Sequence, residues 1–203
     1  MKDVKERTKN WWRQNLANLI TIAGLITSSL LLFELVFNPK RLKRITVFYL
    51  LSGASDFADG KIARWFKVES PFGSIADQFR DKVLFCPSQI IMVIQYSDRF
   101  HSSFLALIFV FAILELLTFF GGTIGIFWYV KGSKKIKINS SDWGKRKTFA
   151  GFIAGLMIIS YIHTANQVFL GIAYLTLVFM IFWSLKSLAE YKERVWPKNN
   201  KAQ

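Results

Sequence analysis

Six apolar stretches separated by short polar segments dominate this chain of 203 residues. Each helical residue adds about 1.5 Å, so about 20 apolar residues cross the ~30 Å hydrocarbon core of a bilayer. The stretches are residues 15–37, 45–66, 73–96, 101–130, 148–162 and 168–188. We therefore predict an all-α integral membrane protein with six transmembrane helices.

The two ends of the chain are polar and basic. Residues 1–14 end close to the pair Trp11-Trp12, which is typical of an amphipathic helix lying in the headgroup layer. Residues 15–190 would then form the membrane domain, and residues 191–203 a polar C-terminal tail.

The distribution of basic residues predicts the orientation. Lys and Arg are concentrated in the N-terminal segment, the 131–147 loop and the tail, so both termini are expected in the cytoplasm. The basic cluster at 40–44 falls on the opposite side in this topology, but the other polar segments together contain more Lys and Arg. The net charge of +14 fits attraction to anionic lipids and anionic substrates, and no nucleic acid partner is expected.

Four aspartates lie where the second and third stretches approach their connecting loop. Asp56 and Asp59 are spaced to share one helix face, and so are Asp77 and Asp81. Carboxylates are costly in a membrane and usually mark a functional site. If the two helices are antiparallel neighbours, the four charges converge near the cytoplasmic face and balance two divalent cations. Oxygen ligands suit Mg²⁺, Mn²⁺ or Ca²⁺.

The residues between the two aspartate pairs suit an anionic ligand. Gly60 and Ala63 follow Asp56 on its side of the helix and leave a strip without bulk, where a ligand can approach closely. Arg64 adds a fixed cation whose donors match phosphate geometry. Together with metal ions, these residues suggest a bound phosphate ester or pyrophosphate.

The whole pattern resembles the signature of the CDP-alcohol phosphotransferase family, also called the CDP-alcohol phosphatidyltransferases. Every position of that signature is matched, by Asp56, Asp59, Gly60, Ala63, Arg64, Gly73, Asp77 and Asp81. The resemblance implies a six-helix membrane enzyme, usually a homodimer. Such an enzyme transfers a phosphatidyl group from CDP-diacylglycerol to an alcohol and releases CMP.

The resemblance also implies roles for individual residues. Two Mg²⁺ or Mn²⁺ ions would be held by Asp56, Asp59, Asp77 and Asp81. The CDP-lipid site would be shaped by Gly60, Ala63, Arg64 and Gly73. Asp81 would also be the general base that takes the proton of the acceptor. Asn18 and Thr21, one turn apart in the first stretch, would contact the nucleotide; helix capping and local hydrogen bonding are the alternative.

The acceptor alcohol is less constrained. The segments 76–84 and 144–148 resemble the phosphatidylglycerophosphate synthases, which use glycerol 3-phosphate. Those synthases usually carry an arginine where this chain has Gly24 and an Arg-Glu pair where it has Leu114-Glu115, so two cations for an acceptor phosphate are missing. Inositol phosphate, another polyol or phosphatidylglycerol are the alternative acceptors.

Four residues outside the motif are candidates for acceptor binding, namely Glu115, Lys145, Arg146 and Lys147. Glu115 lies well inside the fourth stretch, and its alternative role is that of a protonated or hydrogen-bonded structural group. The basic run 145–147 either holds an anionic substrate or marks the cytoplasmic side.

Two other classes of protein also carry carboxylates in membrane helices. A divalent-cation transporter more often places them near the bilayer midplane, at broken helices, and has no need of the Ala-Arg spacing. A catalytically inactive scaffold would not need all four aspartates. Metal-dependent release of CMP from CDP-diacylglycerol would separate an enzyme from both.

Overall fold

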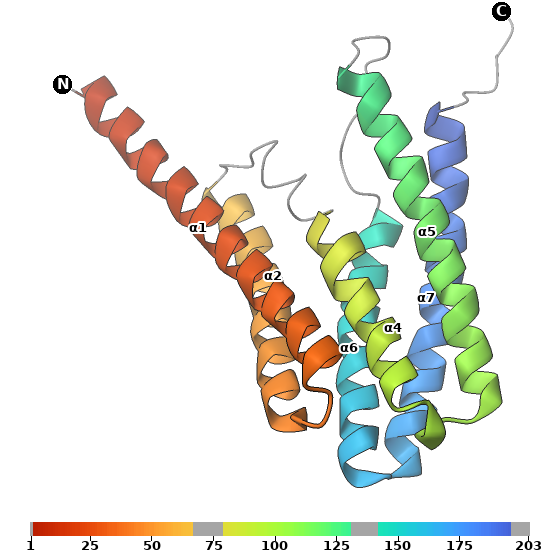
Figure 1. The fold of residues 1–203 in the computed structure, drawn as a ribbon. Helices are drawn as coiled ribbons and strands as arrows, with labels where there is room; N and C mark the ends of the chain where they lie inside the picture. The colour runs from red at the N-terminus through yellow and green to blue at the C-terminus, as the bar shows by residue number, and fades with distance from the viewer. Residues whose placement is uncertain (1, 67–78, 131–141, 196–203) are drawn as a thin grey trace, which may run out of the picture. The chain divides into compact units, whose positions relative to one another are not determined.

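A computed structural model describes residues 2–66, 79–130 and 142–195 (Figure 1). In these ranges the chain is helical apart from short connections and contains no strand, which confirms the all-α prediction. The chain divides into two compact units, Met1–Gln95 and Tyr96–Gln203.

In the first unit, α1 (Lys2–Phe37) and α2 (Leu42–Phe66) pack along each other as a hairpin (Figure 1). The amide of Asn38 donates to the carbonyl of Glu34 at 2.9 Å and closes the last turn of α1. Pro39 then stops the helix, because it has no N–H and restricts the residue before it. Near this turn the seam between the helices is apolar, with buried Leu31, Leu35, Ile45 and Tyr49.

The third stretch is described from Phe79 on and contains the π-helix η1 (Arg80–Phe85) and the α-helix α4 (Cys86–Gln95). Pro87 explains the change of helix type. It has no N–H to donate, and its ring excludes an α-helical carbonyl four residues earlier, so wider turns directly before it relieve the clash. Both elements pack against α1. Because π turns hold more residues, η1 changes the angular position of Arg80 relative to α4.

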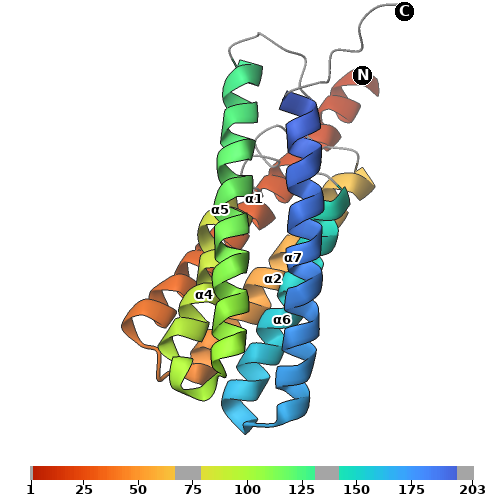
Figure 2. The ribbon, with the colours of Figure 1, turned by 90° about the vertical axis from the view of Figure 1, so that its right-hand side faces the viewer.

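The second unit starts with the 3₁₀ turn η2 (Ser97–Arg99) and continues with α5 (Ser102–Val130), α6 (Asp142–Thr164) and α7 (Gln167–Val195). Helix α7 packs against both α5 and α6 (Figure 2). The turn from α6 to α7 passes through Ala165, whose φ of 54° is the left-handed conformation that commonly ends a helix. Asn166 Oδ1 then accepts from the amide of Val168 at 2.9 Å and caps the start of α7.

Among the described residues, three helical segments are long and apolar enough to cross a membrane, namely Asn18–Phe37, Ser102–Gly121 and Gln167–Ala189. Large apolar side chains such as Phe33, Phe109 and Phe179 are exposed on them, as expected of helices that face lipid. Helices α2 and α6 are not among these segments, and charged residues occupy one part of each. A membrane crossing by all six stretches stays a prediction.

Helices α1, α6 and α7 extend past the expected boundaries. Helix α1 runs without a break across residues 14 and 15. Helix α6 begins at Asp142, so the basic run 145–147 lies on its first turns and not in a loop. Helix α7 continues past residue 190 to Val195. Lys, Arg and Glu are good helix formers, so an apolar stretch marks where lipid contact ends but not where the helix ends.

Candidate active site

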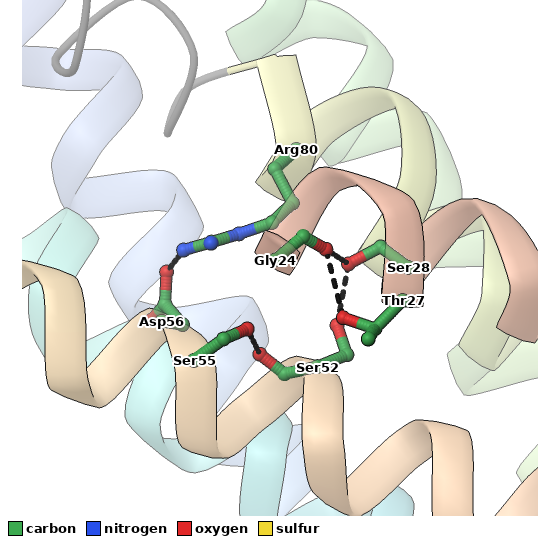
Figure 3. Close-up of polar contacts among 7 residues, drawn as sticks. All are labelled: Gly24, Thr27, Ser28, Ser52, Ser55, Asp56 and Arg80. Carbon is green, nitrogen blue, oxygen red and sulfur yellow. Dashed lines mark hydrogen bonds and ion pairs between the residues drawn. The ribbon is translucent and has the colours of Figure 1, made fainter. Parts of the chain in front are cut away.

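Asp56, the first aspartate of the motif, forms an ion pair with Arg80 (Figure 3). Asp56 lies on α2 and Arg80 begins η1, so the pair joins two helices. The side chain of Arg80 is 2% exposed and that of Asp56 is 36% exposed. The carboxylate is therefore accessible from outside, whereas the guanidinium is enclosed.

Gly24 of α1 makes room for this guanidinium. A Cβ atom at position 24 would overlap Arg80 Nη1 and would lie 2.8 Å from Ser55 Oγ and 3.4 Å from Arg80 Cζ. Glycine is the residue that permits such a close approach. As a result α1, α2 and η1 meet around one buried cation (Figure 3).

Hydroxyl side chains line the seam between α1 and α2 beside the ion pair (Figure 3). Thr27 Oγ1 and Ser28 Oγ donate to the carbonyl of Gly24 at 3.0 and 2.8 Å. Ser55 Oγ donates to the carbonyl of Ser52 at 2.8 Å, and the hydroxyls of Ser28 and Ser52 hydrogen-bond across the seam at 2.5 Å. Small side chains let two helix backbones approach closely, so the two walls of the site are held near each other.

Asp56 fits the role of a cation ligand. Its carboxylate already binds a cation, the Arg80 guanidinium, and is accessible from outside. Its hard oxygen donors suit Mg²⁺ or Mn²⁺. Among the side chains that the structure describes, no three His, Cys, Asp or Glu residues gather. Of the four motif aspartates, Asp56 is the one whose side chain the structure describes.

The other motif residues are described only in part. Helix α2 is helical through Asp59, Gly60, Ala63 and Arg64, as the spacing of the motif predicts, but their side chains are outside the described set. The same holds for Asp81, which follows Arg80 in η1. Two motif positions, Gly73 and Asp77, lie outside the described residues. The convergence of four carboxylates thus stays a prediction.

The two residues expected to contact the nucleotide lie on α1 near this site. Thr21, Gly24 and Ser28 are successive buried positions along the helix, and Asn18 is half-buried one turn earlier. Residues three or four apart share a helix face, so Thr21 lies on the side of α1 that carries Gly24. Their contact with a nucleotide stays a prediction.

Glu115 of α5 has a partner that the sequence did not reveal. Lys147 Nζ of α6 lies 2.6 Å from Glu115 Oε1, and Ser184 Oγ of α7 donates to the same oxygen at 2.9 Å. All three side chains are buried. The three long helices of the second unit therefore meet at one buried ion pair.

The other two basic candidates differ from Lys147. Arg146 is exposed, and its guanidinium carbon lies 5.2 Å from the centroid of the Trp143 ring, a cation–π contact. Lys145 lies in α6, but its side chain is outside the described set. Of the four acceptor candidates, the structure thus joins Glu115 with Lys147 and leaves Arg146 at the surface.

Each departure from the synthase pattern is matched by a cation from elsewhere in the chain. Beside Gly24, Arg80 supplies a guanidinium, and beside Glu115, Lys147 supplies an ammonium group. Neither place therefore lacks a cation. Sequence reasoning missed Arg80, although an arginine next to a motif aspartate was a signal, and nothing in the sequence singled out Ser184.

Comparison with known proteins agrees with the motif. The family described as CDP-alcohol phosphatidyltransferase matches residues 14–183. A CDP-diacylglycerol–glycerol-3-phosphate 3-phosphatidyltransferase from Pseudomonas fluorescens is 27% identical over 191 residues, which cover 90% of this chain and 91% of the relative. A protein of the same name from Haemophilus influenzae is 26% identical over 144 residues, which cover 69% of this chain and 72% of the relative. This chain belongs to the CDP-alcohol phosphatidyltransferase family.

Proposed function

We propose that this enzyme transfers the phosphatidyl group of CDP-diacylglycerol to glycerol 3-phosphate, which makes it a phosphatidylglycerophosphate synthase. The observation that carries the proposal is the complete eight-position motif. Its first aspartate, Asp56, is ion-paired with Arg80, whose guanidinium lies beside Gly24. The name shared by the Pseudomonas and Haemophilus relatives supports glycerol 3-phosphate as the acceptor.

The motif residues divide the chemistry between them. Asp56, Asp59, Asp77 and Asp81 would hold two Mg²⁺ or Mn²⁺ ions, which supply charge neutralisation at the diphosphate when bound. Asp81 accepts the proton of the acceptor hydroxyl. The acceptor oxygen then bonds to the phosphatidyl phosphorus, the bond from that phosphorus to the bridging oxygen breaks, and CMP leaves with that oxygen.

Binding and orientation fall to the residues around the aspartates. Arg64 pairs with the diphosphate, and Gly60, Ala63 and Gly73 leave room for the nucleotide. Asn18 and Thr21 of α1 hydrogen-bond to the nucleotide. A lipid diphosphate bound in this way keeps its acyl chains in the bilayer while the reacting phosphorus is held next to the acceptor.

The acceptor phosphate is bound by cations at the start of α6. Lys147 is the principal candidate, because its ammonium group is paired with Glu115, and a hydrogen bond from Ser184 holds the Glu115 carboxylate in place. Lys145 and Arg146 precede it on the same helix and add positive charge. A cation held in place loses less freedom when it binds a phosphate than a mobile surface lysine does.

The membrane arrangement forms part of the proposal. All six stretches cross the bilayer, the N-terminal part of α1 lies in the headgroup layer, and both termini and the active site face the cytoplasm. Three apolar helices in the described residues support a membrane location, and the concentration of basic residues supports the orientation. As implied by the family resemblance, the enzyme acts as a homodimer.

The test is an assay of the full chain, purified in detergent, with CDP-diacylglycerol and separate acceptors. We expect CMP release with glycerol 3-phosphate in the presence of Mg²⁺ or Mn²⁺, with phosphatidylglycerophosphate as the lipid product. CMP release only with inositol phosphate, a polyol or phosphatidylglycerol would replace the acceptor but keep the reaction. No CMP with any acceptor would contradict the enzyme assignment and reopen that of a cation transporter or scaffold.

A further inference from the structure

The turn between α1 and α2 carries a cluster of basic side chains. Its members, which we call the basic turn, are Lys40, Arg41, Lys43 and Arg44, and all are exposed. The chain is compact here, because the amide of Arg41 donates to the carbonyl of Asn38 at 2.9 Å, and the amide of Arg44 donates to the carbonyl of Arg41 at 2.9 Å. These cations are therefore held close together at the end of the hairpin (Figure 1).

One cation of the basic turn has an acidic partner. Arg44 Nη1 lies 3.4 Å from Glu34 Oε1, and the arginine side chain is 62% exposed whereas that of the glutamate is 9% exposed. Within the described ranges, no acidic side chain pairs with Lys40, Arg41 or Lys43. Four cations and one carboxylate leave a formal charge of +3 at this end of the hairpin.

Helix stability does not explain all of these cations. The end of α1 favours Lys40 and Arg41, but α2 begins at Leu42, so Lys43 and Arg44 lie in its first turn. The N-terminal end of a helix is the positive end of its dipole, where cations are unfavourable. In the proposed topology the turn also lies on the side of the membrane where short loops usually carry few Lys and Arg. Residues placed against local rules commonly serve a function.

The surroundings of the basic turn indicate which anion it meets. The apolar segment Asn18–Phe37 ends three residues before Lys40. The exposed rings of Phe33 and Phe37 lie 4.8 Å apart on α1, and Val47 is exposed on α2. Exposed aromatic rings followed by cations are typical of the interface between membrane and water. The anions at this depth are the phosphates of lipid headgroups.

We propose that the basic turn binds the headgroup of an anionic phospholipid. The site is separate from the candidate active site, because Asp56 lies 14 residues beyond Leu42 on α2, which is about 21 Å along the helix axis. Each Lys or Arg near an anionic membrane surface adds about fivefold in affinity, so the net charge favours anionic over zwitterionic lipids. The site does not depend on the reaction, whereas its place in the outer leaflet follows from the topology under the proposed function.

A fluorescent label beside the basic turn tests the proposal in the full chain. Phe37→Cys provides the attachment point, because Phe37 is exposed, and the single cysteine, Cys86, is replaced by alanine. The labelled chain is reconstituted in phosphatidylcholine vesicles that contain nitroxide-labelled phosphatidylglycerol or, separately, nitroxide-labelled phosphatidylcholine. Quenching then reports which lipid lies beside position 37. We expect a preference for phosphatidylglycerol of about fivefold or more at low ionic strength, and a smaller preference in high salt.

Two variants of the labelled chain change the preference in opposite directions. Arg41→Gln/Lys43→Gln removes two cations that have no acidic partner in the described residues and should lower the preference about threefold or more. Glu34→Gln leaves every cation in place and removes the carboxylate paired with Arg44. The freed charge should raise the preference about twofold or more.

The matched control removes the same amount of charge elsewhere. Lys61→Gln/Lys186→Gln replaces two exposed lysines, one on α2 and one on α7, and should leave the preference at position 37 unchanged. Equal quenching by the two lipids in the labelled chain would overturn the proposal. So would an equal fall in the control and in Arg41→Gln/Lys43→Gln, or no fall in either, since the basic turn would then not select the lipid. A chain that shows the preference but releases no CMP would count against the proposed reaction alone.

Discussion

Replacing Lys147 with methionine removes the cation from the buried ion pair while keeping most of the side-chain volume. Glu115 then keeps the hydrogen bond from Ser184 but loses the ammonium group that lies 2.6 Å from its carboxylate. Breaking a buried pair from one side costs about 3–5 kcal/mol. The charge-assisted hydrogen bond from Ser184 is kept, which favours the lower end of that range, about 3 kcal/mol. For a chain of this size the loss corresponds to a fall in Tm of about 6–12 °C.

The double variant Glu115→Leu/Lys147→Met allows the interaction free energy between the two side chains to be measured. Exchanging both members of a buried pair for apolar residues is often close to neutral, so the double variant should be more stable than Lys147→Met alone. We expect a coupling free energy of about 2 kcal/mol or more from thermal unfolding of all four proteins in one detergent. Lys186→Met is the control, because Lys186 is an exposed lysine of α7 near Phe182 and its loss should leave Tm nearly unchanged.

Activity separates the structural and the acceptor-binding roles of Lys147. The KM for glycerol 3-phosphate should rise in Lys147→Met and stay high in the double variant, because a phosphate ligand cannot be replaced by better packing. Recovery of both Tm and KM in the double variant would refute acceptor binding. If the fall in Tm of the double variant equals the sum of the falls in the two single variants, the two side chains do not stabilise each other, and the ion-pair argument is refuted.

Three further predictions follow from other parts of the molecule. Asp81→Asn should abolish CMP release while CDP-diacylglycerol still binds, because the proton acceptor is lost and the asparagine keeps an oxygen that can contact a divalent cation; full turnover in that variant would remove Asp81 as the base. Chelation of divalent cations should stop CMP release, and added Mg²⁺ or Mn²⁺ should restore it. Undiminished release in excess chelator would contradict the assignment of the four motif aspartates as ligands of divalent cations. Tyr49→Phe removes the acceptor of the 3.2 Å hydrogen bond from Gln89 Nε2 and should cost about 0.5–1.5 kcal/mol of stability without changing the KM values. A change in KM there would show that the hydrogen bond between Tyr49 of α2 and Gln89 of α4 affects the active site.

Apolar periodicity and motif spacing carried most of the fold-level information. Long apolar runs predict helices whatever their neighbours are, so α1, α5 and α7 each contain nearly the whole of a predicted stretch. The ends of α6 and α7 were missed, because charged residues continue a helix without any apolar signal. Eight residues at fixed spacing indicated the family that the comparison then confirmed.

The sequence by itself determined the helices, the motif and the family, since each depends on residues close together along the chain. The tertiary structure alone decided which charges meet. Arg80 reaches Asp56 from 24 residues away, and Glu115 finds Lys147 at 32 and Ser184 at 69 residues' separation. Such pairings depend on how helices pack and on where a missing Cβ leaves room, as at Gly24, and no local pattern encodes either.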